Sequence, residues 1–157
     1  MKLLVLGGTK NLGRHVVEAA LADGHQVTLF NRGLTNPGLF GDVRRIAGDR
    51  AAPDALAAGE WDGVIDMSGF LVRDVALSAS ILRDHCDHYT YMSSIAVYAS
   101  KTTPGMTETA PLLPWPADTR VAPGPGVILV ARLAQEWGRY RTPEGEAAYF
   151  TLNLESS

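Results

Sequence analysis

The sequence predicts an α/β fold built around a doubly wound, mostly parallel sheet, and two features of its first hundred residues support this. The apolar run "LLVL" (3–6) shows no polar alternation, which is typical of a strand buried on both faces. A glycine-containing turn and an amphipathic helix follow, and strands and helices then alternate along the chain. We expect the sheet to end after about its fifth or sixth strand.

The individual elements follow one another at short intervals. Leu12, Val16, Val17, Ala20 and Leu21 recur at helical spacing, and Gly24 ends this helix. Strands are expected over 3–6, 26–30, 43–47 and 63–67, with a fifth that ends near position 93. A short helix at most is expected over 53–58, and a longer one on the face marked by Leu71, Val75, Ala79 and Leu82.

The character of the chain changes after Ser100. We expect residues 1–100 to form the core, 101–126 a proline- and glycine-rich loop, and 127–157 a divergent C-terminal part of the same domain. Positions 127–140 suit a helix, although "VILV" (127–130) also suits a strand, and 147–154 is a possible final strand. If Trp115 and Trp137 leave the sheet edge uncovered, that edge would allow a homodimer.

Composition narrows the class of protein. The net charge of −3 argues against a general nucleic-acid binder. The apolar runs are too short to span a bilayer, and no signal peptide precedes the first strand. A single cysteine, Cys86, allows no internal disulfide, so a cytoplasmic protein is expected. The histidines show no ligand spacing, so no metal site is expected.

The stretch "KLLVLGGTKNLGRH" (2–15) has the outline of a phosphate-binding strand, turn and helix. Gly7 allows a sharp turn, and Gly13 allows the helix to pack close to the strand. The free amides and the dipole at the helix N-terminus favour a pyrophosphate there. The alternative is a glycine turn that holds no ligand.

The end of the second strand selects the cofactor. An acid is usual there in NAD sites, because it accepts hydrogen bonds from the ribose hydroxyls, but this chain has Asn31, Arg32 and Gly33. Arginine grips a 2′-phosphate with two donors, and Lys10 would add a second positive charge, so NADP is favoured and NAD remains possible. The alternative is that both basic residues are solvated surface groups.

Further candidates follow the later strands. Asp49 is placed either to accept from the adenine amino group or to cap a helix ahead of Pro53. Gly69 suits close approach of the backbone to a ligand. The predicted cofactor-binding set is Gly7, Gly8, Thr9, Lys10, Asn11, Leu12, Gly13, Asn31, Arg32, Asp49, Arg50, Met67, Ser68, Gly69 and Ser93.

Four segments, "LVLGGTKNLGRHVVEAALADGHQVTLFNRG", "AGDR", "WDGVIDMSGF" and "YMSSIAVY", resemble the extended and atypical short-chain dehydrogenases/reductases, in particular the NAD-dependent epimerase/dehydratase group. The likeness covers about residues 1–100 and implies an NAD(P)-binding Rossmann core there. It places Gly7 and Gly13 at the outer positions of a G-x-x-G-x-x-G motif, with Lys10 in place of the middle glycine. It also makes Ser94 the candidate catalytic serine, although the residue is as well suited to cap the strand end.

The resemblance fails at the catalytic end. The family uses a Y-x-x-x-K pair, in which the lysine lowers the pKa of a proton-exchanging tyrosine. No tyrosine of this chain has a lysine four residues later. Alignment with the family's catalytic helix places Ile128 and Arg132 near those positions. We therefore expect either an oxidoreductase or epimerase-type protein, impaired by this loss, that acts on an unknown carbonyl, alcohol or sugar nucleotide, or a non-catalytic NADP-binding sensor or interaction module.

Overall fold

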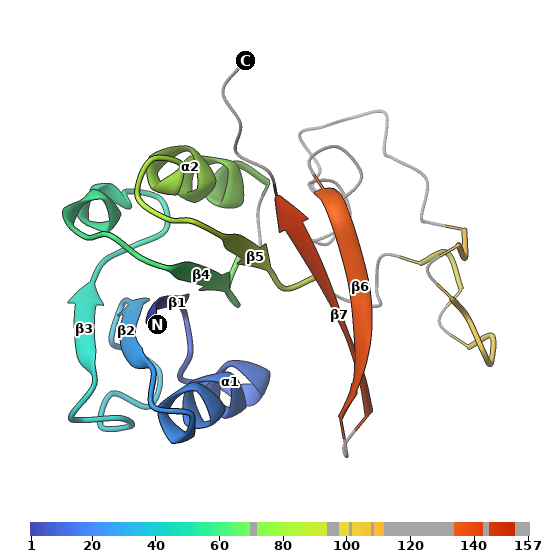
Figure 1. The fold of residues 1–157 in the computed structure, drawn as a ribbon, viewed down its shortest axis with the longest axis horizontal. Coiled ribbons are helices and arrows are strands. Elements are labelled where there is room, and N and C mark those ends of the chain that lie inside the picture. Colours follow the sequence, from blue (N-terminus) through green and yellow to red (C-terminus); the bar gives the residue numbers. More distant parts are fainter. Residues whose placement is uncertain are drawn as a thin grey trace.

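A computed structural model describes residues 1–69, 72–93, 98–100, 102–107, 109–111, 134–142 and 145–152. Its centre is a sheet of parallel strands in the order β3-β2-β1-β4-β5 (Figure 1). These strands are β1 (Lys2–Leu6), β2 (Gln26–Asn31), β3 (Arg44–Ala47), β4 (Gly63–Asp66) and β5 (Tyr89–Tyr91). The predicted doubly wound α/β fold is therefore confirmed.

The first strand-helix-strand unit forms because its apolar positions match the elements they occupy. Leu4, Val5 and Leu6 of β1 are completely buried, as expected for a central strand covered on both faces. Helix α1 (Asn11–Ala22) buries Val17 and Ala20 on one face. The chain leaves α1 through Gly24, whose φ of +76° lies in the left-handed region that favours glycine.

The two faces of the sheet carry separate cores, as α1 and helix α2 (Val72–Leu82) lie on opposite sides (Figure 1). On the α1 side, Val5 and Leu29 pack with Val17. On the α2 side, buried residues of β1, β2, β4, β5, α2 and the short helix η1 (Asp54–Ala58) form one cluster: Leu4, Leu6, Phe30, Leu56, Trp61, Val64, Val75, Ala79, Leu82, Tyr89 and Tyr91. These layers leave the carboxyl ends of the strands open, where ligands bind in such folds.

The C-terminal part differs from the expected helix over 127–140. Residues Ala134–Thr142 form strand β6, which pairs antiparallel with β7 (Gly145–Leu152), and β7 pairs antiparallel with β5. Positions 127–133 lie outside the described residues. Over 134–140 the expected helix is wrong, because pairing with β7 supplies the backbone hydrogen bonds of this segment. Strand β7 covers positions 147–152 of the possible final strand, and positions 153 and 154 lie outside the described residues. Trp137 lies in β6, which is an edge strand of the sheet. Trp115 lies outside the described residues. The homodimer stays a prediction.

Candidate functional site

A cavity of about 590 Å³ lies at the carboxyl ends of the parallel strands. Every residue of the predicted cofactor-binding set lines it: Gly7, Gly8, Thr9, Lys10, Asn11, Leu12, Gly13, Asn31, Arg32, Asp49, Arg50, Met67, Ser68, Gly69 and Ser93. They come from the turn after β1 and from the ends of β2, β3, β4 and β5. Ser94, the candidate catalytic serine, lies outside the described residues.

The turn after β1 is closely packed against its surroundings. Gly8 has a φ of +85°, and a Cβ there would approach Leu29 to 2.9 Å and Val17 to 3.0 Å. A Cβ on Gly13 would lie only 3.1 Å from the Cα of Gly8. Side chains at these two positions would therefore push α1 away from the turn and disturb the shape of the cavity.

The N-terminus of α1 is open toward the cavity. Lys10 is the N-cap residue and has an extended backbone, but its side chain makes no capping hydrogen bond. The first amides of a helix have no partner within the helix, so here they remain available to an anion. Asn11, Leu12 and Gly13, which carry the first of these amides, all line the cavity.

At the end of β2, Asn31 fixes the backbone on both sides of the cavity. Its Nδ2 donates to the Gly7 carbonyl at 3.1 Å, and its Oδ1 accepts from the Gly33 amide at 2.9 Å. Arg32 lies between these anchors and its side chain is 66% exposed, with Nη1 3.9 Å from Oδ2 of Asp49. Such an exposed pair contributes little to stability, so the guanidinium is free to take an anionic ligand.

Asp49 has a structural role in addition to any contact with a ligand. Its Oδ1 accepts from the Ala51 amide at 2.9 Å, and its carbonyl accepts from the Ala52 amide at 3.1 Å. It therefore closes the turn that follows β3. The Asp49 side chain is still 54% exposed, and it lines the cavity.

Arg50 lines the cavity but is held by Asp66, a buried acid of β4 that the sequence reasoning did not select. Nη1 and Nη2 donate to the two carboxylate oxygens at 2.8 and 2.7 Å. Burial by itself lowers the pKa of the Arg50 guanidinium, but the charge and hydrogen bonds of Asp66 outweigh this and raise it. The signal for Asp66 was an isolated acid within a buried strand, because such a group needs a partner.

The far end of the cavity is formed by β4 and β5. The hydroxyl of Tyr91 donates to the Gly69 carbonyl at 2.8 Å, and the hydroxyl of Tyr89 donates to Asp66 at 2.7 Å. Burial raises the pKa of Tyr91 to about 12, and it also raises the pKa of Tyr89. The Oγ of Ser93 is buried and has no hydrogen-bond partner in the described part of the chain.

Several residues that line the cavity lay outside the predicted set. They are Phe30, Gly33, Leu34, Thr35, Gly48, Asp74, Tyr91 and Met92. Gly33, Leu34 and Thr35 belong to the loop between β2 and β3, and no local pattern in the sequence indicates that this loop folds back toward the glycine turn. That loop is brought there by hydrogen bonds between residues far apart in sequence.

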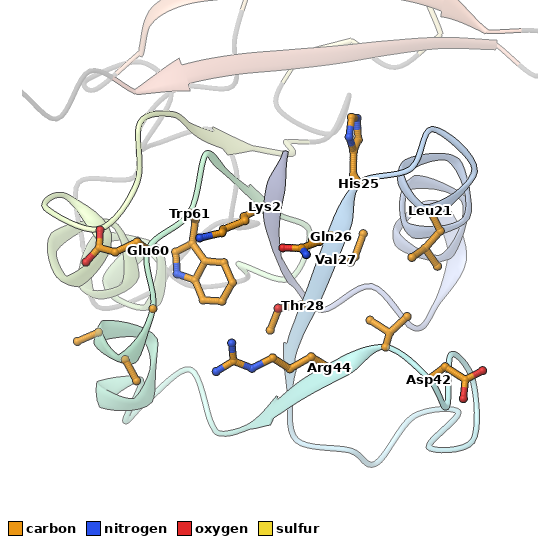
Figure 2. Close-up of a pocket in the computed structure, with 14 residues that line it drawn as sticks. Lys2, Leu21, His25, Gln26, Val27, Thr28, Asp42, Arg44, Glu60 and Trp61 are labelled. Atoms are coloured by element: carbon orange, nitrogen blue, oxygen red, sulfur yellow. The ribbon is translucent and has the colours of Figure 1, made fainter.

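A second cavity, of about 820 Å³, opens at the amino ends of β1, β2 and β3, away from all predicted site residues (Figure 2). Lys2, Gln26 and Arg44 project into it beside Trp61. Both charge signs are present on its walls, with Asp42 and Glu60 opposing the basic residues. Polar side chains of this kind suit a solvated surface of the sheet.

The described residues contain neither a membrane-spanning helix nor a cluster of metal ligands. None of their helices has the length and apolarity needed to cross a membrane. No three of their His, Cys, Asp and Glu side chains are grouped so as to hold a metal ion.

Known proteins resemble this chain over its N-terminal two thirds. It is 34% identical over 114 residues to 2′-dehydrokanamycin reductase of Streptomyces kanamyceticus, a match that covers 69% of this chain and 32% of the relative. It is 32% identical over 114 residues to the chloroplast stem-loop binding protein of 41 kDa b of Arabidopsis thaliana, covering 62% of this chain and 30% of the relative. The match thus spans about a third of each curated relative.

The fold is also similar to that of the Bordetella bronchiseptica enzyme WbmG in complex with NAD and UDP, with a TM-score of 0.62 and 16% identity. That match covers 73% of this chain and 44% of WbmG. No protein-family model matches the chain. The sheet order and the glycine turn are those of a nucleotide-binding Rossmann fold. The two curated relatives match this chain over a stretch of 114 residues. The chain therefore has a Rossmann fold like the N-terminal part of the extended short-chain dehydrogenases/reductases, and its sequence is similar to that of their NAD-dependent epimerase/dehydratase group.

Proposed function

We propose that the chain binds NADP(H) and serves as the cofactor-binding part of an oxidoreductase or epimerase-type protein. The observation that carries this proposal is the cavity at the carboxyl ends of the strands, which is lined by every residue of the predicted cofactor set. Its volume, about 590 Å³, is within the range of roughly 300–1,000 Å³ usual for ligand pockets.

The donor groups in this cavity fit a dinucleotide. The uncapped amides of α1 suit the pyrophosphate, and Lys10 and Arg32 suit a 2′-phosphate. Asp49, fixed by its own turn, presents an acceptor for the adenine amino group. Ser93 Oγ and Arg50 Nε are buried polar atoms without a partner among the described residues, in two side chains that line this cavity. When bound, the nicotinamide ring supplies hydride transfer.

Cofactor titration tests this proposal. Calorimetry should give a dissociation constant for NADP at least about tenfold below that for NAD, because only NADP offers a phosphate to both basic residues. Arg32→Ala should raise the constant for NADP about tenfold and change that for NAD little. Arg44→Ala is the matched control, because Arg44 is an exposed arginine that lines the other cavity. Equal affinities in the wild type would contradict the preference for NADP.

A second candidate, a cofactor-binding module without chemistry, is supported by the state of the two tyrosines of β5. Tyr91 and Tyr89 both donate their hydroxyl protons to fixed acceptors, and burial raises both pKa values. Neither is therefore suited to exchange a proton near neutral pH. Ser94 is proposed as the substrate-binding hydroxyl on the family resemblance alone.

Turnover measurements separate the two candidates. NADPH oxidation with small carbonyl compounds, and epimerisation of sugar nucleotides, should occur in the presence of this chain if it is catalytic. Cofactor binding without any turnover would reject catalysis and leave the binding module. A module that acts as a sensor requires a change of oligomeric state or partner binding with NADP.

The composition and the outer strand support three further proposals. The negative charge favours a protein that does not bind RNA, so a stem-loop RNA should not be retained in filter binding at moderate salt. A single cysteine favours the cytoplasm, which cell fractionation would test. The long outer strand β6 favours a homodimer, which would elute from a sizing column at twice the monomer mass.

A further inference from the structure

We propose that Asn36 is a positioning residue for the 2′-phosphate, because it joins the two basic walls of the cavity. One wall is the glycine turn that carries Lys10, and the other is the loop after β2 that begins at Arg32. This inference rests on the proposed preference for NADP. Asn36 does not itself line the cavity, and no pattern in the sequence suggested it as a site residue.

The first contact is with the glycine turn. Nδ2 of Asn36 donates to the carbonyl oxygen of Thr9 at 2.8 Å, across 27 positions of sequence. The Thr9 carbonyl and the Lys10 amide belong to one planar peptide group. The hydrogen bond therefore fixes the orientation of the peptide from which Lys10 leaves the turn.

The second set of contacts fixes the loop itself. Asn36 has a φ of +46°, a left-handed conformation that asparagine tolerates better than most residues, and its carbonyl accepts from the Leu39 amide at 3.0 Å. Arg45 of β3 donates to the carbonyls of Pro37 at 2.9 Å and Leu39 at 3.0 Å. The loop is thus anchored to β3 on one side of Asn36.

On the N-terminal side of Asn36, the amide of Gly33 donates to Oδ1 of Asn31. Asn31 also donates through Nδ2 to the carbonyl of Gly7. Gly33, Leu34 and Thr35 line the cavity between Arg32 and Asn36. The segment that carries Arg32 is therefore held at both ends, and Asn36 is its direct connection to the residue before Lys10.

This geometry matters for one cofactor more than for the other. Binding of a 2′-phosphate by two cations is strongest when both are already in place, because ordering flexible side chains and loops on binding costs affinity. NAD has no 2′-phosphate, so loosening this connection leaves most of its contacts intact. A residue that only held the loop in place would change the affinities for NADP and for NAD equally.

The test is calorimetric titration of Asn36→Gly with NADP and with NAD. Glycine keeps the left-handed backbone and removes only the side-chain donor. The dissociation constant for NADP should rise about fivefold to tenfold, while that for NAD should change by less than about twofold. The control is Gly38→Ala in the same loop, where a Cβ meets nothing within 4 Å.

A double-mutant cycle decides whether Asn36 acts through Lys10. Asn36→Gly should cost much less NADP affinity in a Lys10→Ala background than in the wild type. Additive effects, or equal losses for both cofactors, would overturn the inference while the preference for NADP stands. A wild type without that preference would contradict the proposed function, and the positioning role of Asn36 would fall with it.

Discussion

The guanidinium of Arg50 and the carboxylate of Asp66 form two parallel hydrogen bonds, at 2.8 and 2.7 Å, beneath the proposed cofactor cavity. Asp66 is completely buried, and the side chain of Arg50 is 14% exposed. The same carboxylate accepts from the hydroxyl of Tyr89 and from the amide of Ser68. The segment after β3 and the ends of β4 and β5 are therefore tied to one charged group.

Asp66→Asn should lower the free energy of unfolding by about 3 kcal/mol, because it leaves a buried guanidinium without its counter-charge. Urea denaturation measures the loss. Asp84→Asn, on an exposed residue, is the control and should change stability by less than about 0.5 kcal/mol. A wild-type denaturation midpoint for Asp66→Asn would contradict the role of the pair.

Gly8→Ala should destabilise the protein by about 1–3 kcal/mol, because the backbone has a φ of +85° and the new Cβ would crowd Leu29 and Val17. Thermal unfolding followed by circular dichroism measures this change. Gly41→Ala serves for comparison, since a Cβ there meets nothing within 4 Å. Similar melting temperatures for the two variants would show that the turn tolerates a side chain.

Stability should fall on the alkaline side as the buried tyrosines titrate. Burial raises the pKa of Tyr91 to about 12, whereas a tyrosine in the unfolded chain titrates near ~10. Between these values the folded protein keeps a proton that the unfolded chain loses, so the stabilisation is complete below about pH 10 and declines up to about pH 12. Tyr91→Phe should give a shallower decline in urea unfolding measured across this range. If the free energy of unfolding of Tyr91→Phe fell with pH as steeply as that of the wild type, titration of Tyr91 would not contribute to the decline.

Cys86 should react slowly with a thiol reagent at pH 8, because burial raises its pKa to about 11 and the thiolate is the reactive form. The rate of reaction with a chromogenic disulfide should rise with pH until about pH 11. Unfolding in urea should make the reaction fast at pH 8, which controls for reagent quality. Rapid labelling of the folded protein at pH 8 would contradict a buried, protonated thiol.

Much of the fold follows from local sequence patterns. The strand at 3–6, the helix face with Val17 and Ala20, and the turn through Gly7 and Gly8 depend on apolar spacing and glycine positions within about thirty residues. Such short-range patterns also placed the predicted cofactor residues at strand ends, which parallel topology brings to one edge of the sheet. The structure gathers them around one cavity.

The C-terminal part shows where local patterns stop being informative. Positions 134–140 of the stretch that suited a helix belong to β6, whose backbone hydrogen bonds are completed by β7 rather than within the segment. A strand takes its stability from a partner that can lie anywhere in the chain, so its own residues do not determine it.

Local sequence patterns were enough to predict the alternation of strands and helices over about residues 1–93, the glycine turn and the basic residue at the end of β2, because each depends on neighbouring residues. Only the tertiary structure decided that Arg50 pairs with Asp66, that Asn36 reaches the Thr9 carbonyl, and that β7 joins β5. Each of these contacts joins residues well separated along the chain, and each forms because a buried polar group or an open strand edge needs a partner. That requirement is visible in the sequence, but the partner is chosen by the packing of the whole fold.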